Sequence, residues 1–243
     1  MQENKYDGLI ADYTRRKAEL EDKWQRRKRS RTQEEAFALF VRCILSSRTN
    51  WDRVVVVVKE LQRNGLLSGG NATQLLGPVR KIGGMVKYKD RAEWIEEDRE
   101  LFPVVFWLID SVQKGEIPVR AEGLGPKDIF EERNLQNFMS LLQERGVTQE
   151  ALRTAVKRLK GASDKQASHF LTSLGFEGYA IIDTYILNKL AEFGIIEEKP
   201  NNLTSSRYHA IEQRMKQWCS RIGIPMHLLD MLWWRGGVLD DTE

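Results

Sequence analysis

The sequence predicts an all-α protein, because apolar side chains recur at helical spacing in almost every segment between its turns. Glycine-rich or polar breaks separate these segments, and the chain has no internal repeat and no low-complexity stretch. The segments expected to be helical are 5–28, 34–46, 51–64, 72–79, 86–101, 126–144, 148–160, 164–174, 184–193, 204–221 and 225–234.

Local signals support individual helices along this order. Thr32-Gln33-Glu34-Glu35 has the pattern of a capping box, in which a threonine and a glutamate satisfy the first free amides of a helix. The run Val54–Val58 is rich in β-forming residues, but no turn signal separates it from Trp51-Asp52-Arg53 or from Lys59-Glu60-Leu61-Gln62. A buried helix is therefore favoured for this run.

A short turn between two predicted helices is the first candidate site. Leu159 lies at the end of one amphipathic helix, Gly161 supplies the positive φ that stops it, and Ser163 or Asp164 can cap the next. The free N–H groups of such a turn, together with the positive end of a helix dipole, bind phosphate without any net charge. We interpret Gly161, Ala162 and Ser163 as a hairpin that grips a DNA backbone. The alternative is an ordinary pair of antiparallel helices with a glycine cap.

An amine and a carboxylate follow this turn. Lys165 lies in the first turn of the second helix, where the helix dipole disfavours a positive charge. A lysine that is partly desolvated there has a lowered pKa and can act as a neutral nucleophile, whereas the simpler alternative is a solvated lysine. Asp183 follows the apolar run Ala180-Ile181-Ile182 and precedes another helix, so we expect it to cap that helix. A carboxylate fixed in this way can stabilise a cationic sugar in a transition state.

The run Lys165-Gln166-Ala167-Ser168-His169-Phe170-Leu171, followed by Ala180-Ile181-Ile182-Asp183, resembles the helix-hairpin-helix DNA glycosylase superfamily. Within it, the run is most similar to the short 8-oxoguanine DNA glycosylases of archaea and some bacteria. A weaker resemblance covers roughly residues 34–95 and 146–235. The resemblance implies that Lys165 is the Schiff-base lysine and that Asp183 is the catalytic aspartate.

The resemblance also implies an architecture of two helical lobes that flank a DNA-binding cleft. Mapped onto this chain, a discontinuous lobe is expected from residues 1–50 and 161–243, and a continuous lobe from residues 51–160. Residues 102–137 contain three prolines and look longer than the matching part of the short glycosylases. We expect a surface insertion there.

Several residues depart from the pattern of the family. Ser163 stands where the hairpin usually has a second glycine. Thr184 and Tyr185 follow the aspartate where relatives carry a basic residue and a histidine, although a tyrosine hydroxyl can replace a phosphate contact. The tail after Trp234 ends in acidic residues instead of the basic end expected for recognition of oxidised guanine. The choice of base is therefore less constrained than the catalytic class.

By resemblance, the loop of Ser47, Arg48 and Thr49 enters the minor groove of DNA and fills the gap that a flipped nucleotide leaves. Arg48 can then contact the orphaned base. The alternative is that Arg48 only satisfies the carbonyls at the end of the preceding helix.

By resemblance, Asp230 and Trp234 are candidates for the base pocket, where a carboxylate accepts N–H bonds and a ring stacks on the flipped base. Two adjacent tryptophans cannot share one helical face, so Trp233 is expected to pack into the core. Asp230 can equally be a surface residue.

The net charge of +3 does not by itself identify a nucleic-acid binder, but the basic residues are clustered. Each cluster is either a contact to a DNA backbone or a solvated surface. The clusters are Arg26-Arg27-Lys28-Arg29-Ser30-Arg31 and, around Gly83-Gly84, Arg80, Lys81, Lys87, Lys89 and Arg91.

The two cysteines, Cys43 and Cys219, lie in amphipathic segments, and we expect buried thiols. They cannot supply the four thiolates of an iron–sulphur cluster, and three scattered histidines argue against a zinc site. We expect no required cofactor, with a monovalent cation at the hairpin backbone as an option. The chain has no apolar run that spans a bilayer and no signal peptide, so we expect no membrane partner. We also expect a monomer. It would act in the prokaryotic cytoplasm with the nucleoid, or in a eukaryotic nucleus.

Together these features predict a bifunctional DNA glycosylase/AP lyase whose partner is double-stranded DNA with a damaged purine, foremost 8-oxoguanine. One alternative is an enzyme of the same fold that removes an alkylated or deaminated base. The chain could also be a non-catalytic DNA-binding protein or an all-helical scaffold for protein interactions. Lys165 and Asp183 argue against a non-catalytic DNA-binding protein, because phosphate binding alone requires neither residue. A scaffold would leave the amine, the carboxylate and the basic loop unexplained.

Overall fold

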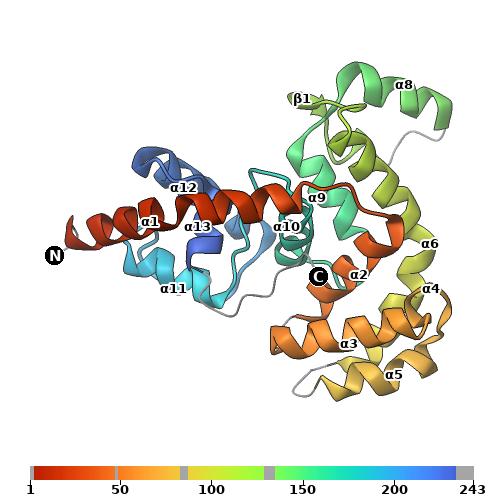
Figure 1. The fold of residues 1–243 in the computed structure, drawn as a ribbon. Helices are drawn as coiled ribbons and strands as arrows, with labels where there is room; N and C mark the ends of the chain where they lie inside the picture. Colours follow the sequence, from red (N-terminus) through yellow and green to blue (C-terminus); the bar gives the residue numbers. More distant parts are fainter. Residues whose placement is uncertain (1–2, 47–48, 83–86, 129–134, 234–243) are drawn as a thin grey trace. The chain divides into compact units, whose positions relative to one another are not determined.

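The computed structural model describes residues 3–46, 49–82, 87–128 and 135–233, and these are almost entirely helical (Figure 1). The all-α class predicted from the hydrophobic periodicity is therefore confirmed. The elements are α1 (Glu3–Arg27), α2 (Gln33–Leu45), α3 (Trp51–Arg63), α4 (Leu66–Gly69), α5 (Ala72–Lys81), α6 (Tyr88–Gln113), β1 (Val119–Leu124), α8 (Leu135–Arg145), α9 (Gln149–Lys157), α10 (Asp164–Ser173), α11 (Thr184–Glu192), α12 (Ser205–Ile222) and α13 (Met226–Trp233).

Capping side chains set the helix starts that the sequence predicts. At the start of α2, the Glu35 N–H donates to Thr32 Oγ1 at 3.2 Å, and the Thr32 N–H donates to Glu35 Oε2 at 2.8 Å. The predicted capping box is thus confirmed. The valine run is helical as well, since Val54 and Val58 lie on the buried face of α3.

The predicted helix end at residue 101 is wrong, because α6 continues through Pro103 to Gln113. A proline inside a helix removes a backbone hydrogen bond and costs about 3 kcal/mol. Phe102 and Ile109, on the same stretch of α6, are almost completely inaccessible to solvent. Burial of each such side chain stabilises the fold by roughly 1.5–3 kcal/mol, which offsets the cost of the proline.

The remainder of the expected insertion contains the strand β1, which helical periodicity did not predict. Val119 and Leu124 of β1 each form an isolated bridge with Val147. Gly146 has a φ of +70°, and a Cβ there would collide with the Pro118 carbonyl oxygen, so this pairing needs glycine. Of the helix expected over 126–144, the structure describes α8, and residues 129–134 lie outside the described residues.

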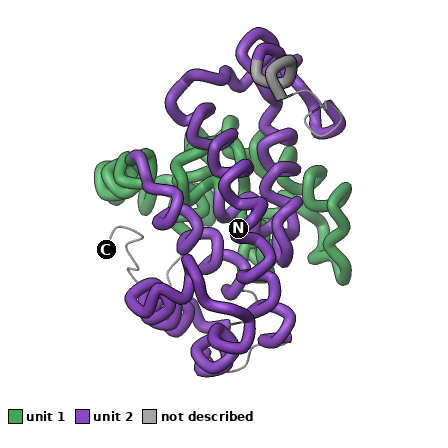
Figure 2. Tube along the Cα trace, turned by 90° about the vertical axis from the view of Figure 1, so that its right-hand side faces the viewer, with its two compact units in different colours: residues 1–29, 171–243 green, residues 30–170 purple. Residues whose placement is uncertain are grey.

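Unit 2 of the chain comprises residues 30–170 (purple in Figure 2). Its centre is a cluster of aromatic rings from three helices. The Phe40 ring centroid of α2 lies 5.9 Å from that of Phe102 on α6 and 5.6 Å from that of Phe170 on α10. All three side chains are buried. This aromatic cluster attaches α10, which carries the candidate lysine, to α2 and α6.

Unit 1 joins residues 1–29 to 171–243 (green in Figure 2). In it α13 packs against both α1 and α12. The Trp218 ring centroid lies 5.8 Å from that of Phe193 and 5.9 Å from that of Trp233. Trp233 therefore packs into the core of unit 1, as predicted for one of the two adjacent tryptophans.

The boundaries of the two units differ from the expected lobes. The expected discontinuous lobe of residues 1–50 and 161–243 includes residues 30–50 and 161–170, which the structure groups with unit 2. The physical reason is local packing. Helix α2 contacts α3 and α6, and Phe170 belongs to the same aromatic cluster as Phe40.

Neither cysteine forms a disulfide, and both thiols are buried, as predicted. Burial raises the pKa of the Cys219 thiol to about 12. Among the helices that the structure describes, none combines the length and the apolar character that a membrane span requires.

Candidate functional site

The hairpin between α9 and α10 has the geometry that the sequence predicts. Gly161 has a φ of +74°, in the left-handed region that glycine adopts without strain. The structure adds a second constraint that the sequence does not indicate. A Cβ on residue 161 would lie 2.5 Å from Cε3 of Trp94, a side chain of α6. Gly161 is therefore required both for its backbone angle and for the close approach of the tryptophan ring.

Contacts inside the hairpin fix where α10 begins. The Ala167 N–H donates to the Ser163 carbonyl at 2.9 Å, so Ser163 is the capping residue and Asp164 is the first residue of the helix. The Ser163 N–H donates to Gln166 Oε1 at 3.3 Å. Lys157 Nζ, on the last turn of α9, lies 2.6 Å from Asp164 Oδ1. This ion pair joins the two helices on either side of the turn.

Some backbone amides of the hairpin region have no acceptor within the described part of the chain. The N–H groups of Gly161 and of Lys165 are among them. Lys165 belongs to the first turn of α10, where amides cannot be satisfied by the helix itself. Unsatisfied amides at a helix start form an anion site, and a DNA phosphate fits this chemistry.

The side chain of Lys165 is half-buried. Its Nζ forms neither a hydrogen bond nor an ion pair with any residue that the structure describes. The opposite face of α10 is anchored, because Ala167 and Phe170 are completely buried. Beside it, the His169 ring centroid lies 5.1 Å from that of Trp51, the first residue of α3. A fixed helix thus carries an amine that no salt bridge neutralises.

Asp183 caps α11, and this prediction is confirmed. Its Oδ1 accepts a hydrogen bond from the Ile186 N–H at 2.8 Å. The side chain is half-buried. The carboxylate therefore lies at the positive end of the α11 dipole, which favours a negative charge there.

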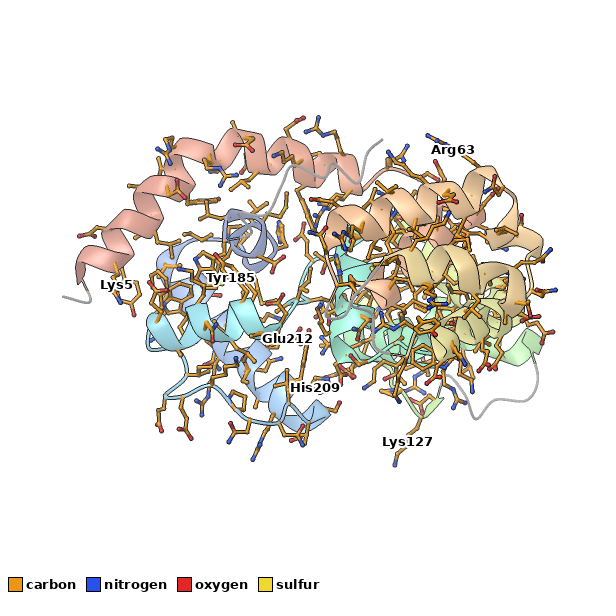
Figure 3. All side chains as sticks on the ribbon, turned by 90° about the horizontal axis from the view of Figure 1, so that it is seen from below. Lys5, Arg63, Lys127, Tyr185, His209 and Glu212 are labelled. Carbon is orange, nitrogen blue, oxygen red and sulfur yellow. The ribbon has the colours of Figure 1, made fainter. Side chains whose placement is uncertain are left out.

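The extended segment that leads into Asp183 is held by two buried side chains of α12 that the sequence did not indicate. The Ala180 N–H donates to Glu212 Oε1 at 2.8 Å. The Tyr208 hydroxyl accepts a hydrogen bond from the Ile182 N–H at 3.2 Å and donates to the Ala180 carbonyl. Figure 3 labels Glu212 on α12. These bonds satisfy buried backbone groups and fix the approach of the chain to Asp183.

Lys165 lies in unit 2 and Asp183 lies in unit 1. Each is positioned by its own unit, and their pairing stays a prediction.

Of the predicted minor-groove loop, Ser47 and Arg48 lie outside the described residues. Thr49 is described, and its hydroxyl donates to the Leu45 carbonyl at 2.5 Å. Arg91 Nη1 donates to the same carbonyl at 3.1 Å. Arg91 is buried, so its assignment to a DNA-facing basic cluster is wrong: it satisfies the end of α2 instead.

For the predicted base pocket, Trp234 lies outside the described residues, and Asp230 is buried on α13. The Tyr185 hydroxyl donates to the Trp233 carbonyl at 2.8 Å, while 38% of Tyr185 remains exposed. Figure 3 labels Tyr185, which belongs to α11. The hydroxyl expected to replace a phosphate contact therefore holds the end of α13. Tyr185 lies two residues after the capping aspartate in the sequence, and part of its side chain is exposed.

Comparison with protein families and with sequences of known proteins gives a consistent result. A family model described as 8-oxoguanine DNA glycosylase matches residues 16–224. A relative from Korarchaeum cryptofilum, named 8-oxoguanine DNA glycosylase/AP lyase, is 29% identical over 233 residues, with 94% of each chain covered. A relative of the same name from Fusobacterium nucleatum is 29% identical over 194 residues, covering 79% of this chain and 75% of that one.

Solved structures show the same fold. The 8-oxoguanine DNA glycosylase of Thermotoga maritima matches with a TM-score of 0.71 at 22% identity, covering 98% of this chain and 99% of that one. The Methanocaldococcus jannaschii 8-oxoguanine glycosylase/lyase, solved in complex with DNA containing 8-oxoguanine, matches with a TM-score of 0.67 at 23% identity, covering 95% and 99%.

Proposed function

Because the chain belongs to the 8-oxoguanine DNA glycosylase family, we propose that it is a bifunctional DNA glycosylase/AP lyase that excises 8-oxoguanine from duplex DNA. The observation that carries this proposal is Lys165, a half-buried amine without an ion-pair partner in the described chain, in the first turn of the helix that follows the hairpin. The names of the relatives support the same activity.

The first step is binding of the DNA backbone. The amides of Gly161 and Lys165 offer two N–H donors to a phosphate, and the dipole of α10 adds a positive potential. These contacts read no sequence, which suits an enzyme that must scan DNA for a rare lesion. Extrusion of the damaged nucleotide costs a few kcal/mol, and it brings the sugar within reach of the amine.

The chemical steps need an amine and a carboxylate. The attack requires a deprotonated amine: Lys165 Nζ bonds to C1′ while the bond from C1′ to the purine nitrogen breaks. The base leaves with that electron pair and takes up the proton that the newly bonded nitrogen gives up. Asp183 stabilises the positive charge that develops on the sugar. The nitrogen lone pair then forms a double bond to C1′, the C1′–O4′ bond breaks, and O4′ takes up a proton, which gives a protonated imine. Loss of a proton from C2′ expels the 3′ phosphate, which cuts the strand.

We propose that these steps require no cofactor, because Lys165 supplies the nucleophile and Asp183 the compensating charge. A monovalent cation bound by hairpin carbonyls is compatible with this scheme and stays a prediction. The substrate is double-stranded DNA, and the protein acts as a monomer.

The decisive experiment is trapping of the imine. Borohydride should reduce it to a stable protein–DNA adduct on a duplex with 8-oxoguanine, and Lys165→Gln should abolish the adduct. Lys114→Gln is a matched control, because Lys114 belongs to the same unit and is exposed beside Asp110. It should trap as the wild type does. An adduct that persists in Lys165→Gln would assign the nucleophile to another residue.

A second candidate is excision of a different purine by the same chemistry. It is favoured by the departures from the family pattern, above all the tail after Trp234, which ends in acidic residues instead of a basic end. Tyr185 follows the capping aspartate in place of a histidine, and its hydroxyl is bound to the Trp233 carbonyl. A panel of duplexes with single alkylated, deaminated or oxidised bases separates the two. Faster single-turnover cleavage of 8-oxoguanine than of every other lesion supports the first candidate.

A further inference from the structure

One buried acidic side chain lies directly behind the hairpin. Asp98 of α6 is 2% exposed, and its Oδ1 accepts a hydrogen bond from the Lys160 N–H at 2.7 Å. Its other oxygen, Oδ2, is buried and has no hydrogen-bond partner within the described part of the chain. Burial of a polar oxygen without a hydrogen-bond partner destabilises the fold. The presence of Asp98 at this position therefore points to a function for the hydrogen bond that its other oxygen accepts.

Helix α6 also approaches Gly161, the residue after Lys160, through the ring of Trp94. Trp94 lies one turn before Asp98 on α6, and it closes the space above the Cα of Gly161. On the exposed side, Glu97 Oε2 lies 3.5 Å from Lys160 Nζ. Helix α6 therefore holds two consecutive residues of the turn, Lys160 by its amide and Gly161 by its Cα.

The direction of the Lys160 N–H constrains the orientation of the next backbone amide, that of Gly161. Because the Lys160 N–H points inward to Asp98, the chain leaves α9 along a fixed path before Gly161 turns it. The N–H of Gly161 follows immediately and has no acceptor in the described chain. The hydrogen bond to the Asp98 carboxyl group restricts the conformations of the turn before DNA binds. Such preorganisation lowers the entropic cost of binding and raises the affinity for DNA.

We propose that Asp98 is a positioning residue for DNA binding, which fixes the Lys160 amide and thereby presents the Gly161 amide to a DNA phosphate. This inference rests on the proposed function, since it assumes that the hairpin binds DNA. It assigns to α6 a role that no sequence pattern indicates. Asp98 touches neither the DNA nor the reacting atoms in this scheme.

The environment of Asp98 also shifts its pKa. Burial raises the pKa of Asp98 to about 7, the Lys160 N–H bond and the Lys160 charge lower it, and Glu97 raises it. The charged groups that face it are thus Glu97 on α6 and Lys160 on the hairpin. The protonated acid still accepts the amide through Oδ1, so the proposed contact does not depend on the charge.

Two substitutions separate positioning from mere packing. Asp98→Asn keeps the shape and an acceptor oxygen for the Lys160 amide, whereas Asp98→Leu keeps the volume and removes the acceptor. The measurements are the Kd for a duplex with a tetrahydrofuran abasic-site analogue and the single-turnover rate of strand cleavage at saturating abasic-site DNA. Neither measurement depends on which damaged base the enzyme selects.

We expect Asp98→Leu to raise the Kd about 10-fold, while the cleavage rate at saturation stays within about 2-fold of the wild type. Asp98→Asn should stay within about 3-fold in both. An unchanged Kd in Asp98→Leu overturns the inference, and so does an equal loss of cleavage at saturation, because disruption of the whole site would produce that loss. If the wild type itself does not bind the duplex, the proposed function fails instead.

Asp98→Leu can unfold unit 2, since it leaves a buried amide without an acceptor. A melting curve detects this, and Trp94→Leu then carries the test. Trp94 is half-buried, and its loss removes the support of Gly161 without unpairing any amide. A raised Kd with an unchanged rate at saturation supports positioning by α6, and an unchanged Kd overturns it.

Discussion

Substitution of Gly161 by alanine tests whether the hairpin is as tightly constrained as its geometry indicates. Two separate penalties act at this position. The φ of +74° is unfavourable for any residue with a Cβ, and the new methyl group would lie 2.5 Å from Cε3 of Trp94. Since Trp94 is only half-buried, its ring can move at some cost.

The magnitude follows from the two penalties taken separately. A left-handed backbone costs an alanine roughly 1–2 kcal/mol, and insertion of a methyl group into filled space costs roughly 1–3 kcal/mol. Gly161→Ala should therefore lower the free energy of unfolding by about 2–5 kcal/mol. Gly115→Ala is the matched control in the same unit, because Gly115 has a φ of +78° and nothing within 4 Å of its Cβ position. It should lose only the first of the two terms.

The assay is urea denaturation of both variants, followed by measurement of the Kd for an abasic-site duplex. We expect Gly161→Ala to be the less stable of the two and to bind DNA at least 10-fold more weakly, while Gly115→Ala binds as the wild type does. If both variants lose the same stability and both bind normally, the Trp94 ring yields freely, and the close approach has no role in shaping the hairpin.

Three further predictions concern unit 1. Tyr208→Phe removes the hydroxyl that bridges the segment before Asp183, so we expect a loss of about 1–3 kcal/mol of stability and slower excision at saturating DNA; normal excision would show that the bridge does not position Asp183. Burial lowers the pKa of His227 to about 4, so below pH 6.5 the unfolded chain binds a proton that the folded chain does not. The free energy of unfolding should fall as pH drops from 6.5 to 4, and denaturation curves of His227→Gln should show a weaker dependence on pH. Tyr185→Phe removes the hydrogen bond to the Trp233 carbonyl. Single-turnover assays should then show slower excision of 8-oxoguanine with nearly unchanged cleavage of abasic sites, and an equal loss of both rates would refute a role of Tyr185 in recognition of the damaged base.

Much of the fold could be predicted because its signals are local. Helix starts follow from capping side chains such as Thr32 and Asp183, and the hairpin follows from the glycine at 161. These signals depend only on a few neighbouring residues. The passage of α6 through Pro103 could not be predicted in this way, because it depends on the burial of side chains against helices that are distant in sequence.

The candidate site shows the same division. Lys165 and Asp183 carry their own local signature, a first helical turn and a helix cap. Asp98 lies in the charged run Glu96-Glu97-Asp98-Arg99-Glu100, which is typical of a solvated helix surface. Only the fold reveals that one member of this run is buried and bonded to an amide of the hairpin. The wrong prediction for Arg91 has the same cause, since a basic residue near other basic residues gives no sign of burial.

Each of the two candidate catalytic residues follows a backbone segment that a buried polar side chain holds from another helix. In unit 2 Asp98 holds the turn before Lys165, and in unit 1 Tyr208 and Glu212 hold the segment before Asp183. Buried polar contacts are a poor source of stability, because an apolar side chain would fill the same space without losing hydration. Their advantage is directional: a hydrogen bond fixes one backbone amide in one orientation, and catalysis requires positions accurate to about 0.5 Å. These buried side chains are therefore best understood as supports for the chemistry of Lys165 and Asp183, and their loss should impair DNA binding or excision beyond what the loss of stability alone explains.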